Sequence, residues 1–491
     1  MAANGENADY LHPRYMEMLP DWDLVQHCID GERAIKKQGF NYLPHPASDG
    51  ASNDTRYKAY QERAVFLPAT ERTLQAMLGI AFNKPPSVDL TGKLDILQDD
   101  VDNKGQSLSQ MIRDALGENL AKGRAGVLVD YLGAGEQTAA TESRAVLRLF
   151  YAKEIINWRT QNDKLTLVVM KYDEDARDDD PDSFGENRVT VWLELRMVNG
   201  QACWRKWYNT EQTMVVNGIE RKLNNTQLVP FLDANSRPFD RLPFFFIGAV
   251  NNDECPDRAP LRGIASLNVK HYQSEADLAE LAHIVGQPTL VAKMSKSWYE
   301  NVIKPAGGIR MGASKGISVE NDAGSDVKLL QAQERTISMA MCERRERQMA
   351  MLGAALIERG SAPKTATEAE FDAQTDNSIL SLCASNVEAA FNAALEHAGR
   401  FMSGSGTITL NKRFVDISVD SNMLNTMISG MQTGAIPLSD FIRWAQNAGV
   451  IDDKKTVDEV EDQMRNASPI PGATPPVSTD KVVVEDEEDE E

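Results

Sequence analysis

The stretch ERRERQMAMLGAALIERGSAPKTATEAEF, residues 343–371, contains the end of one helix, a sharp break and the start of another. Five consecutive charged residues come first, and an apolar half follows them. Gly360 and Pro363 then end the helix, because glycine closes helix C-termini and proline cannot continue a helix. Thr365 or Thr367, each with a glutamate three residues later, predicts the start of the next helix. We therefore expect two helices joined by a short loop that carries one lysine.

Two further helices are expected around this break. Residues 261–285 have the three- and four-residue steps of a packing helix, and 368–402 repeat those steps in an alanine-rich setting. The positions on the first helix are Ile264, Leu267, His271, Ser274, Leu278, Leu281 and Val285. Those on the second are Leu380, Cys383, Val387, Ala390, Ala394, Ala398 and Phe401. Such faces need a neighbour to pack against, so we expect helix–helix contacts or contacts between subunits.

The first half of the chain mixes helices and strands. Helices are predicted over 57–82 and over 107–123, with Ser107 as N-cap of the second. A buried strand is predicted to follow the second helix. Residues 145–250 are β-rich, with strands expected at 165–172, 189–198, 202–209 and 213–218, and a later strand at 407–419. The sequence therefore predicts an α+β fold.

Composition limits the classes of protein. The net charge is −21, of which Glu485–Glu491 contributes −7, so non-specific coating of nucleic acid is not expected. No apolar run is long enough to span a bilayer, and the first residues have no signal-peptide pattern, so neither membrane insertion nor secretion is expected. The five cysteines form no CxxC pair, which favours reduced and mostly buried thiols.

Motifs of enzymes are missing from the sequence. The six histidines lack metal-ligand spacing, so no metal and no cofactor is expected, and His271 is interpreted as a packed core or interface histidine. No phosphate-binding glycine loop and no nucleophile motif occurs. We expect a protein that is not an enzyme, although a hydrolase with an unrecognised carboxylate site stays an alternative.

Several stretches, in this order, resemble the portal proteins of tailed bacteriophages, the head-to-tail connectors, and most closely a compact portal-like branch. They are MLGIAFNKPP (77–86), GRAGVLVDY (123–131), EIINWR (154–159), RLPFFFIG (241–248), PLRGIASLNVKHYQSEADLAELAH (260–283), PTLVAKM (288–294), RQMAMLGAAL (347–356), TATEAEFDAQTDNSIL (365–380) and LNKRF (410–414). Each is a packing motif, and their ordered sum over residues 20–465 carries the resemblance.

The resemblance implies a division of the chain into the parts of a portal subunit. These are an N-terminal wing (1–255), stem helix 1 (256–286), a small β-rich clip (287–331), stem helix 2 (332–359), a tunnel loop (360–367), a long helix and strand returning to the wing (368–420), a short crown (421–466) and an acidic, disordered tail (467–491).

The resemblance also implies a function. Portal subunits form a ring, twelve-fold in virions, at one capsid vertex, and the protein is made in the cytoplasm of the bacterial host. Double-stranded DNA is packaged through the ring by the terminase large subunit and is later ejected. Head-completion or tail adaptor proteins bind at the clip, and major capsid protein and scaffolding protein meet the wing. Another phage structural, adaptor or injected protein is the alternative.

Candidate contact residues follow from this division. In the tunnel loop, DNA-contact candidates are Arg359, Gly360, Ser361, Pro363 and Lys364; an ordinary turn with a solvated lysine is an equal alternative. Glu343 and Arg347 are four residues apart and are expected to pair along one helix. The charges expected to pair between neighbouring subunits of the ring are Glu343, Arg344, Arg345, Glu346 and Arg347. Docking candidates on the clip, or else a solvated rim, are Lys293, Lys296, Lys304, Arg310 and Lys315.

Overall fold

The computed structural model describes residues 8–46, 54–132, 144–175, 188–208, 213–216, 219–222, 226–233, 235–285, 289–306, 324–330, 336–357, 378–402, 404–412, 421–447, 451 and 455–466. The chain divides into two compact units, Met1–Lys412 and Arg413–Glu491. The fold is α+β, as the sequence predicts, and the described strands pair antiparallel.

The larger unit begins with helices that the sequence patterns did not predict. They are α1 (Pro13–Asp30), α2 (Glu32–Lys37) and a 3₁₀ turn, Gly39–Asn41. Trp22 of α1 is fully buried, and its Nε1 donates to the carbonyl of Lys122 at 2.8 Å. This bond fixes α1 against α5 (Leu108–Lys122), which begins at Ser107 as expected, because the Ser107 hydroxyl accepts from the amide of Gln110.

The single helix predicted over 57–82 is wrong. The structure has α3 (Asp54–Arg63) and α4 (Ala69–Ala81) instead. Pro68 lies between them, and proline removes a backbone donor and disfavours helix in the residue before it. Asn268, on helix α6 (Arg262–Val285), bonds to both sides of the break. Its Oδ1 accepts from the Thr70 amide at 3.1 Å, and its Nδ2 donates to the Leu67 carbonyl at 2.8 Å.

Two antiparallel sheets form most of the β part of this unit, and the other described strands pair two by two. One joins β11, β2 and β3 in that order, and the other joins β10, β7, β6, β5 and β4. The strands expected around 165–172, 189–198 and 202–209 are confirmed within these sheets, and the one around 213–218 pairs in a separate ribbon, β8–β9. Their bounds are β2 Arg124–Leu132, β3 Arg144–Tyr151, β4 Ile155–Gln161, β5 Lys164–Asp175, β6 Arg188–Val198, β7 Gln201–Tyr208, β8 Thr213–Val216, β9 Ile219–Lys222, β10 Val229–Pro230 and β11 Phe244–Gly248.

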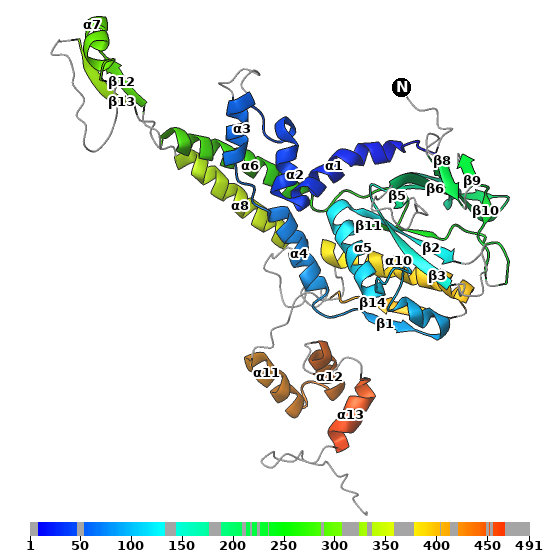
Figure 1. Ribbon diagram of the computed structural model, residues 1–491. Helices are drawn as coiled ribbons and strands as arrows, with labels where there is room; N and C mark the ends of the chain where they lie inside the picture. Colours follow the sequence, from blue (N-terminus) through cyan, green and yellow to red (C-terminus); the bar gives the residue numbers. More distant parts are fainter. Residues whose placement is uncertain are drawn as a thin grey trace, which may run out of the picture. The chain divides into compact units, whose positions relative to one another are not determined.

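The long helix α10 (Ile379–Met402) packs on the three-stranded sheet and on α5 (Figure 1). Its expected packing positions are buried, apart from Phe401, which is half-buried. The predicted start of this helix at residue 368 lies outside the described residues. After α10 the chain forms β14 (Gly406–Thr409), the beginning of the predicted strand 407–419. Its partner is β1 (Ser87–Leu90), a pairing that the sequence did not predict; the 3₁₀ helix Gly92–Leu97 follows β1.

Between α6 and α8 (Thr336–Ile357), the chain forms a small lobe. Strands β12 (Thr289–Lys293) and β13 (Asp326–Leu330) pair antiparallel, as the β-rich prediction requires. The prediction missed a helical segment after β12, formed by α7 (Lys296–Trp298) and a π-helical turn, Tyr299–Ile303. Ser295 explains this segment, because its hydroxyl accepts from the amide of Trp298 as an N-cap does.

The second unit is helical, with α11 (Ser421–Gln432), α12 (Leu438–Asn447) and α13 (Val457–Asn466). Helix α13 begins with a capping box: the Thr456 hydroxyl accepts from the Glu459 amide, and the Glu459 carboxylate accepts from the Thr456 amide. A small core of Phe441, Ile442 and Val460 holds α12 and α13 together. Residues 467–491 lie outside the described residues.

Candidate functional site

Helix α6 is the element on which the candidate site is built. One side of it packs against α1, α3 and α4. Polar contacts fix this side: the Tyr60 hydroxyl donates to Asp277 at 2.7 Å, and Glu280 pairs with Arg56 and Arg63 of α3. Helix α6 is therefore held at a defined rotation about its axis, and the opposite side is presented to α8.

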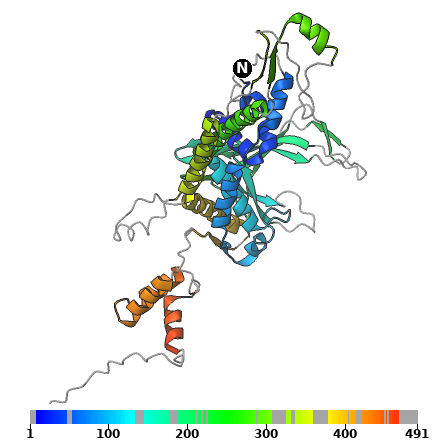
Figure 2. The same ribbon diagram turned by 90° about the vertical axis from the view of Figure 1, so that its left-hand side faces the viewer.

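Helices α6 and α8 lie side by side in both views and run antiparallel (Figure 1, Figure 2). The direction follows from the contacts. Arg345 Nη1 donates to the carbonyl of Lys270 at 2.7 Å, whereas Cys342, earlier on α8, lies against Glu275, later on α6. The chain thus leaves along α6, forms the small lobe, and returns along α8.

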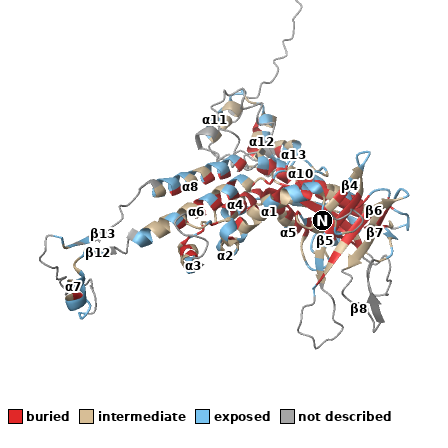
Figure 3. Ribbon diagram, turned by 90° about the horizontal axis from the view of Figure 1, so that it is seen from above, coloured by how far each residue is buried: buried red, intermediate tan, exposed pale blue. Residues whose placement is uncertain are grey.

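Helix α8 is covered along one stripe only. Cys342, Met349, Gly353 and Leu356 are buried, at steps of seven, four and three residues that keep them on one face. Large apolar side chains elsewhere on the helix are open to solvent. Their exposed fractions are 57% for Met339, 45% for Met341, 72% for Met351 and 41% for Leu352. Figure 3 shows exposed residues along α8, in contrast to the buried strands of the sheets.

An open groove of about 470 Å³ separates α8 from α4. Small residues let the two helices approach at this place. A methyl group added at Gly353 would lie 3.4 Å from Cγ2 of Thr73. The groove is lined mainly by apolar atoms, with Arg72 and Glu346 at its polar edge. Nothing in this lining resembles a catalytic constellation.

The charged residues at the start of the opening stretch divide into two groups. Glu343 and Arg347 pair at 3.1 Å along α8, as the four-residue spacing predicts, and both are exposed, so the pair contributes only about 0.2–0.5 kcal/mol. Arg345 and Glu346 instead contact α6 of the same chain. Arg344 is exposed. Whether these charges also pair between subunits stays a prediction.

Three of the expected docking lysines, Lys293, Lys296 and Lys304, are exposed on the small lobe. Arg310 and Lys315 lie outside the described residues. The same is true of the whole expected tunnel loop. Its candidate residues are Arg359, Gly360, Ser361, Pro363 and Lys364. The structure therefore brings the lysines onto one lobe but does not test the DNA-contact candidates.

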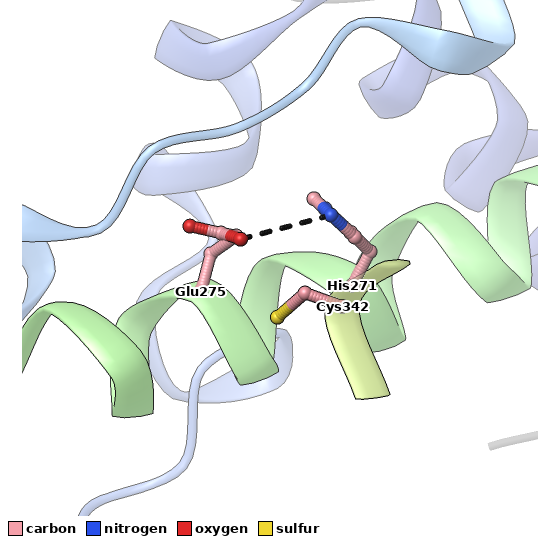
Figure 4. Close-up of side chains that lie close together, drawn as sticks. All are labelled: His271, Glu275 and Cys342. Atoms are coloured by element: carbon pink, nitrogen blue, oxygen red, sulfur yellow. Dashed lines mark ion pairs between the residues drawn. The ribbon is translucent and has the colours of Figure 1, made fainter. Parts of the chain in front are cut away.

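His271, Glu275 and Cys342 form a cluster at the α6–α8 contact that the sequence did not predict (Figure 4). His271 is buried, as expected of a packed histidine, and its Nε2 lies 3.3 Å from Glu346 Oε1 and 3.8 Å from Glu275 Oε1. Burial, reinforced by Glu275, raises the pKa of the Cys342 thiol to about 11. Spacing along the chain could not reveal this cluster, because its members come from two helices. What the sequence does show is a pair within each helix: His271 and Glu275 are four residues apart, and so are Cys342 and Glu346.

All five cysteines have free thiols, and four of them are buried, which confirms the expectation of unpaired, mostly buried cysteines. Among the described helices, none combines the length and apolar character needed to cross a membrane.

Comparisons with known proteins give the following matches. A protein family described as "Domain of unknown function (DUF4055)" matches residues 260–402, the segment from α6 through α10. No curated protein matches the chain. Among solved structures, a chain of "Virion of native gene transfer agent (GTA) particle" is 13% identical, with a TM-score of 0.37, and the match covers 83% of this chain and 94% of that one.

Two further solved structures are similar at the same level. A chain of "Neck of native GTA particle computed with C12 symmetry" is 12% identical with a TM-score of 0.38, covering 82% of this chain and 95% of that one. A chain of "Neck of empty GTA particle computed with C6 symmetry" is 12% identical with a TM-score of 0.38, covering 81% and 94%. TM-scores of this size do not by themselves establish a common fold.

Proposed function

We propose that this chain is a portal-type subunit of a tailed phage or phage-like particle. In this proposal it forms a ring at the head–tail vertex through which DNA enters and leaves, and it performs no catalysis itself. The ordered sequence resemblance over residues 20–465 suggests this function. The observation that carries it is the exposed apolar surface of α8, with Met339, Met341, Met351 and Leu352 uncovered in the single chain.

In a closed ring, a neighbouring subunit would cover such an exposed apolar surface. A contact between two different faces of identical subunits generates either a ring or an open filament. The paired helices α6 and α8 offer two unlike faces, since Ile284 of α6 is 47% exposed and α8 carries the methionines. A neighbouring subunit that covers these side chains would remove apolar surface from water, which stabilises the assembly by about 25 cal/mol per Å².

The charge of the chain agrees with a conduit that lets DNA slide. Each phosphate neutralised by a basic side chain adds salt-dependent affinity, so a strongly basic channel would hold the duplex in place. A subunit with a net charge of −21 and few cationic loops would instead repel and centre the duplex. In this proposal the exposed Lys293, Lys296 and Lys304 of the small lobe face the terminase large subunit or an adaptor protein. The wing would meet capsid and scaffolding protein.

Electron microscopy and native mass measurement of the purified full-length protein test the proposal. We expect rings with a central opening. Replacing Met351 and Leu352 by glutamate should shift the protein to monomers, because two charges would be buried at the subunit contact. The matched control is Met16→Glu on α1, a methionine that is 50% exposed and lies outside the α6–α8 pair.

Two outcomes would contradict the proposal. A monomeric wild-type protein at micromolar concentration would remove the ring. A closed oligomer without an opening would favour the alternative of a capsid-associated adaptor. Rings that persist in the Met351→Glu, Leu352→Glu double variant would show that the subunit contact lies elsewhere on the chain.

A further inference from the structure

The contact between α6 and α8 contains donor atoms of three chemical types in one place. The imidazole of His271, a carboxylate oxygen of Glu275 and the thiol of Cys342 offer ligand atoms that all lie within 4.8 Å of one another. Figure 4 shows these side chains converging from the two facing helices. His271 and Cys342 are buried, and Glu275 is half-buried.

A fourth donor, Glu346, lies beside the same histidine, outside the group of three whose ligand atoms are all within 4.8 Å of one another. Glu346 lies one helical turn after Cys342, just as Glu275 lies one turn after His271, so each helix presents a four-residue pair on the face that meets the other helix. Oxygens of both glutamates approach the same nitrogen, Nε2 of His271, at 3.3 and 3.8 Å. The imidazole proton can serve only one of these carboxylates, and the Cys342 thiol is a second hydrogen-bond partner of Glu275; one cation could replace both protons and bind all of these groups.

From this geometry we propose that His271, Glu275, Cys342 and Glu346 form a tetrahedral site for Zn²⁺ that joins α6 to α8. Nitrogen, sulfur and carboxylate ligands together suit zinc better than magnesium or calcium, which take oxygen ligands. In a tetrahedral site with bonds of about 2.0–2.3 Å, ligand atoms lie about 3.3–3.8 Å apart. The two His271–glutamate distances already have these values, and the thiol lies within 4.8 Å of the His271 and Glu275 donor atoms.

The surroundings of the site fit a bound dication. The ligand set would carry three negative charges, two from the glutamates and one from the thiolate, so Zn²⁺ leaves one negative charge. Arg345, whose guanidinium is held by the carbonyl of Lys270 beside His271, offsets this charge. The other imidazole nitrogen, Nδ1, is buried without a hydrogen-bond partner among the described residues, so Nε2 is the nitrogen committed to polar partners.

Zinc would act here as a structural cross-link. The chain between the two helices contains the whole small lobe, so the α6–α8 contact closes a long loop. A metal that binds only the closed arrangement stabilises it by mass action. The site lies inside one subunit and does not depend on ring formation, so the metal assay and the assembly assay can fail separately.

Cobalt substitution of the full-length protein tests the site directly. Co²⁺ bound by a thiolate gives a charge-transfer band in the near ultraviolet, and tetrahedral Co²⁺ gives intense visible bands. We expect both, with saturation at about one Co²⁺ per chain and loss of the bands when Zn²⁺ is added. Cys342→Ser should remove the charge-transfer band, whereas the control Cys255→Ser, at the exposed cysteine, should keep it.

A second variant separates the ligand from the fold. The side chain of Glu346 is about half exposed, so Glu346→Gln should leave the protein folded. This variant should keep the thiolate band and weaken Co²⁺ binding by about tenfold or more. Wild-type protein that is folded by circular dichroism and gives no thiolate band would overturn the proposal, as would a band unchanged in Cys342→Ser. In either case the cluster is a histidine that hydrogen-bonds Glu346 and lies 3.8 Å from Glu275, beside a buried thiol.

Discussion

One buried histidine is expected to make the stability of this protein depend on pH. His397 on α10 is fully buried, and neither imidazole nitrogen has a hydrogen-bond partner in the described part of the chain. Its ring lies 4.4 Å from that of Phe239. Burial lowers the pKa of His397 to about 3, and Arg241 and Arg400 add to the effect. The folded chain therefore keeps this histidine neutral at any pH near neutrality.

This histidine predicts a loss of stability in acid. The ordinary pKa of an unfolded histidine is about 6.5, so between about pH 6.5 and 3 the unfolded chain binds a proton that the folded chain does not. The free energy of unfolding should fall by about 2 kcal/mol from pH 7 to pH 5 on this account. His397→Leu should reduce that difference in urea denaturation, whereas the exposed His283→Leu should leave it unchanged. An equal pH dependence in both variants would contradict the prediction.

At the scale of elements, the end of α5 depends on one glycine. Gly123 has a φ of 68°, and a Cβ there would lie 2.9 Å from the carbonyl oxygens of Asp257 and Arg258. Gly200, in the turn between β6 and β7, has a φ of 79° and no atom within 4 Å of its Cβ position. The two glycines share the left-handed conformation and differ in surrounding space.

Alanine at each glycine separates conformation from packing. Gly200→Ala should lower the free energy of unfolding by about 1–2 kcal/mol, the cost of the left-handed conformation alone. Gly123→Ala should cost about 1–3 kcal/mol more, because backbone oxygens must move away from the methyl group. Denaturant unfolding of both variants gives the comparison. Equal losses would mean that the 257–258 segment moves without cost.

The element scale also shows where sequence reasoning succeeds. Helices α5, α6, α8 and α10 follow from periodicity, and the predicted strands around 165–208 are confirmed. Reasoning failed where a local pattern depended on one residue or on a distant partner. Pro68 divides the helix predicted over 57–82. Strand β1 forms only because β14 pairs with it from more than three hundred positions away. Directly beside this pairing, the Thr91 amide donates to the Ser405 carbonyl at 2.9 Å.

At the scale of the whole molecule, rotational symmetry would multiply every side chain near the axis. If the chain forms the proposed ring, Lys364 of each subunit contributes to one ring of positive charge. A cationic ring contacts DNA phosphates without reading base sequence, because phosphate contacts carry no sequence information. Lys364 lies outside the described residues, so this contact rests on the sequence resemblance.

Particles assembled with Lys364 variants test that contact. Lys364→Glu should reduce the amount of full-length DNA packaged or retained, since the ring of charge changes sign. Lys364→Arg, which keeps the charge, should package normally. The measurement is the length of DNA extracted from purified particles. Normal packaging by the Lys364→Glu particles would make the lysine an ordinary solvated residue of a helix–helix turn.

The sequence by itself determined the α+β class, the helices α5, α6, α8 and α10, the Glu343–Arg347 pair and the buried packing of His271, because these depend largely on neighbours within one or two helical turns. The tertiary structure alone decided that Cys342 meets His271 and that the methionines of α8 stay uncovered. Both depend on the rotation and antiparallel alignment of α6 and α8. That alignment is set by side-chain packing between segments about seventy residues apart, which no local periodicity encodes.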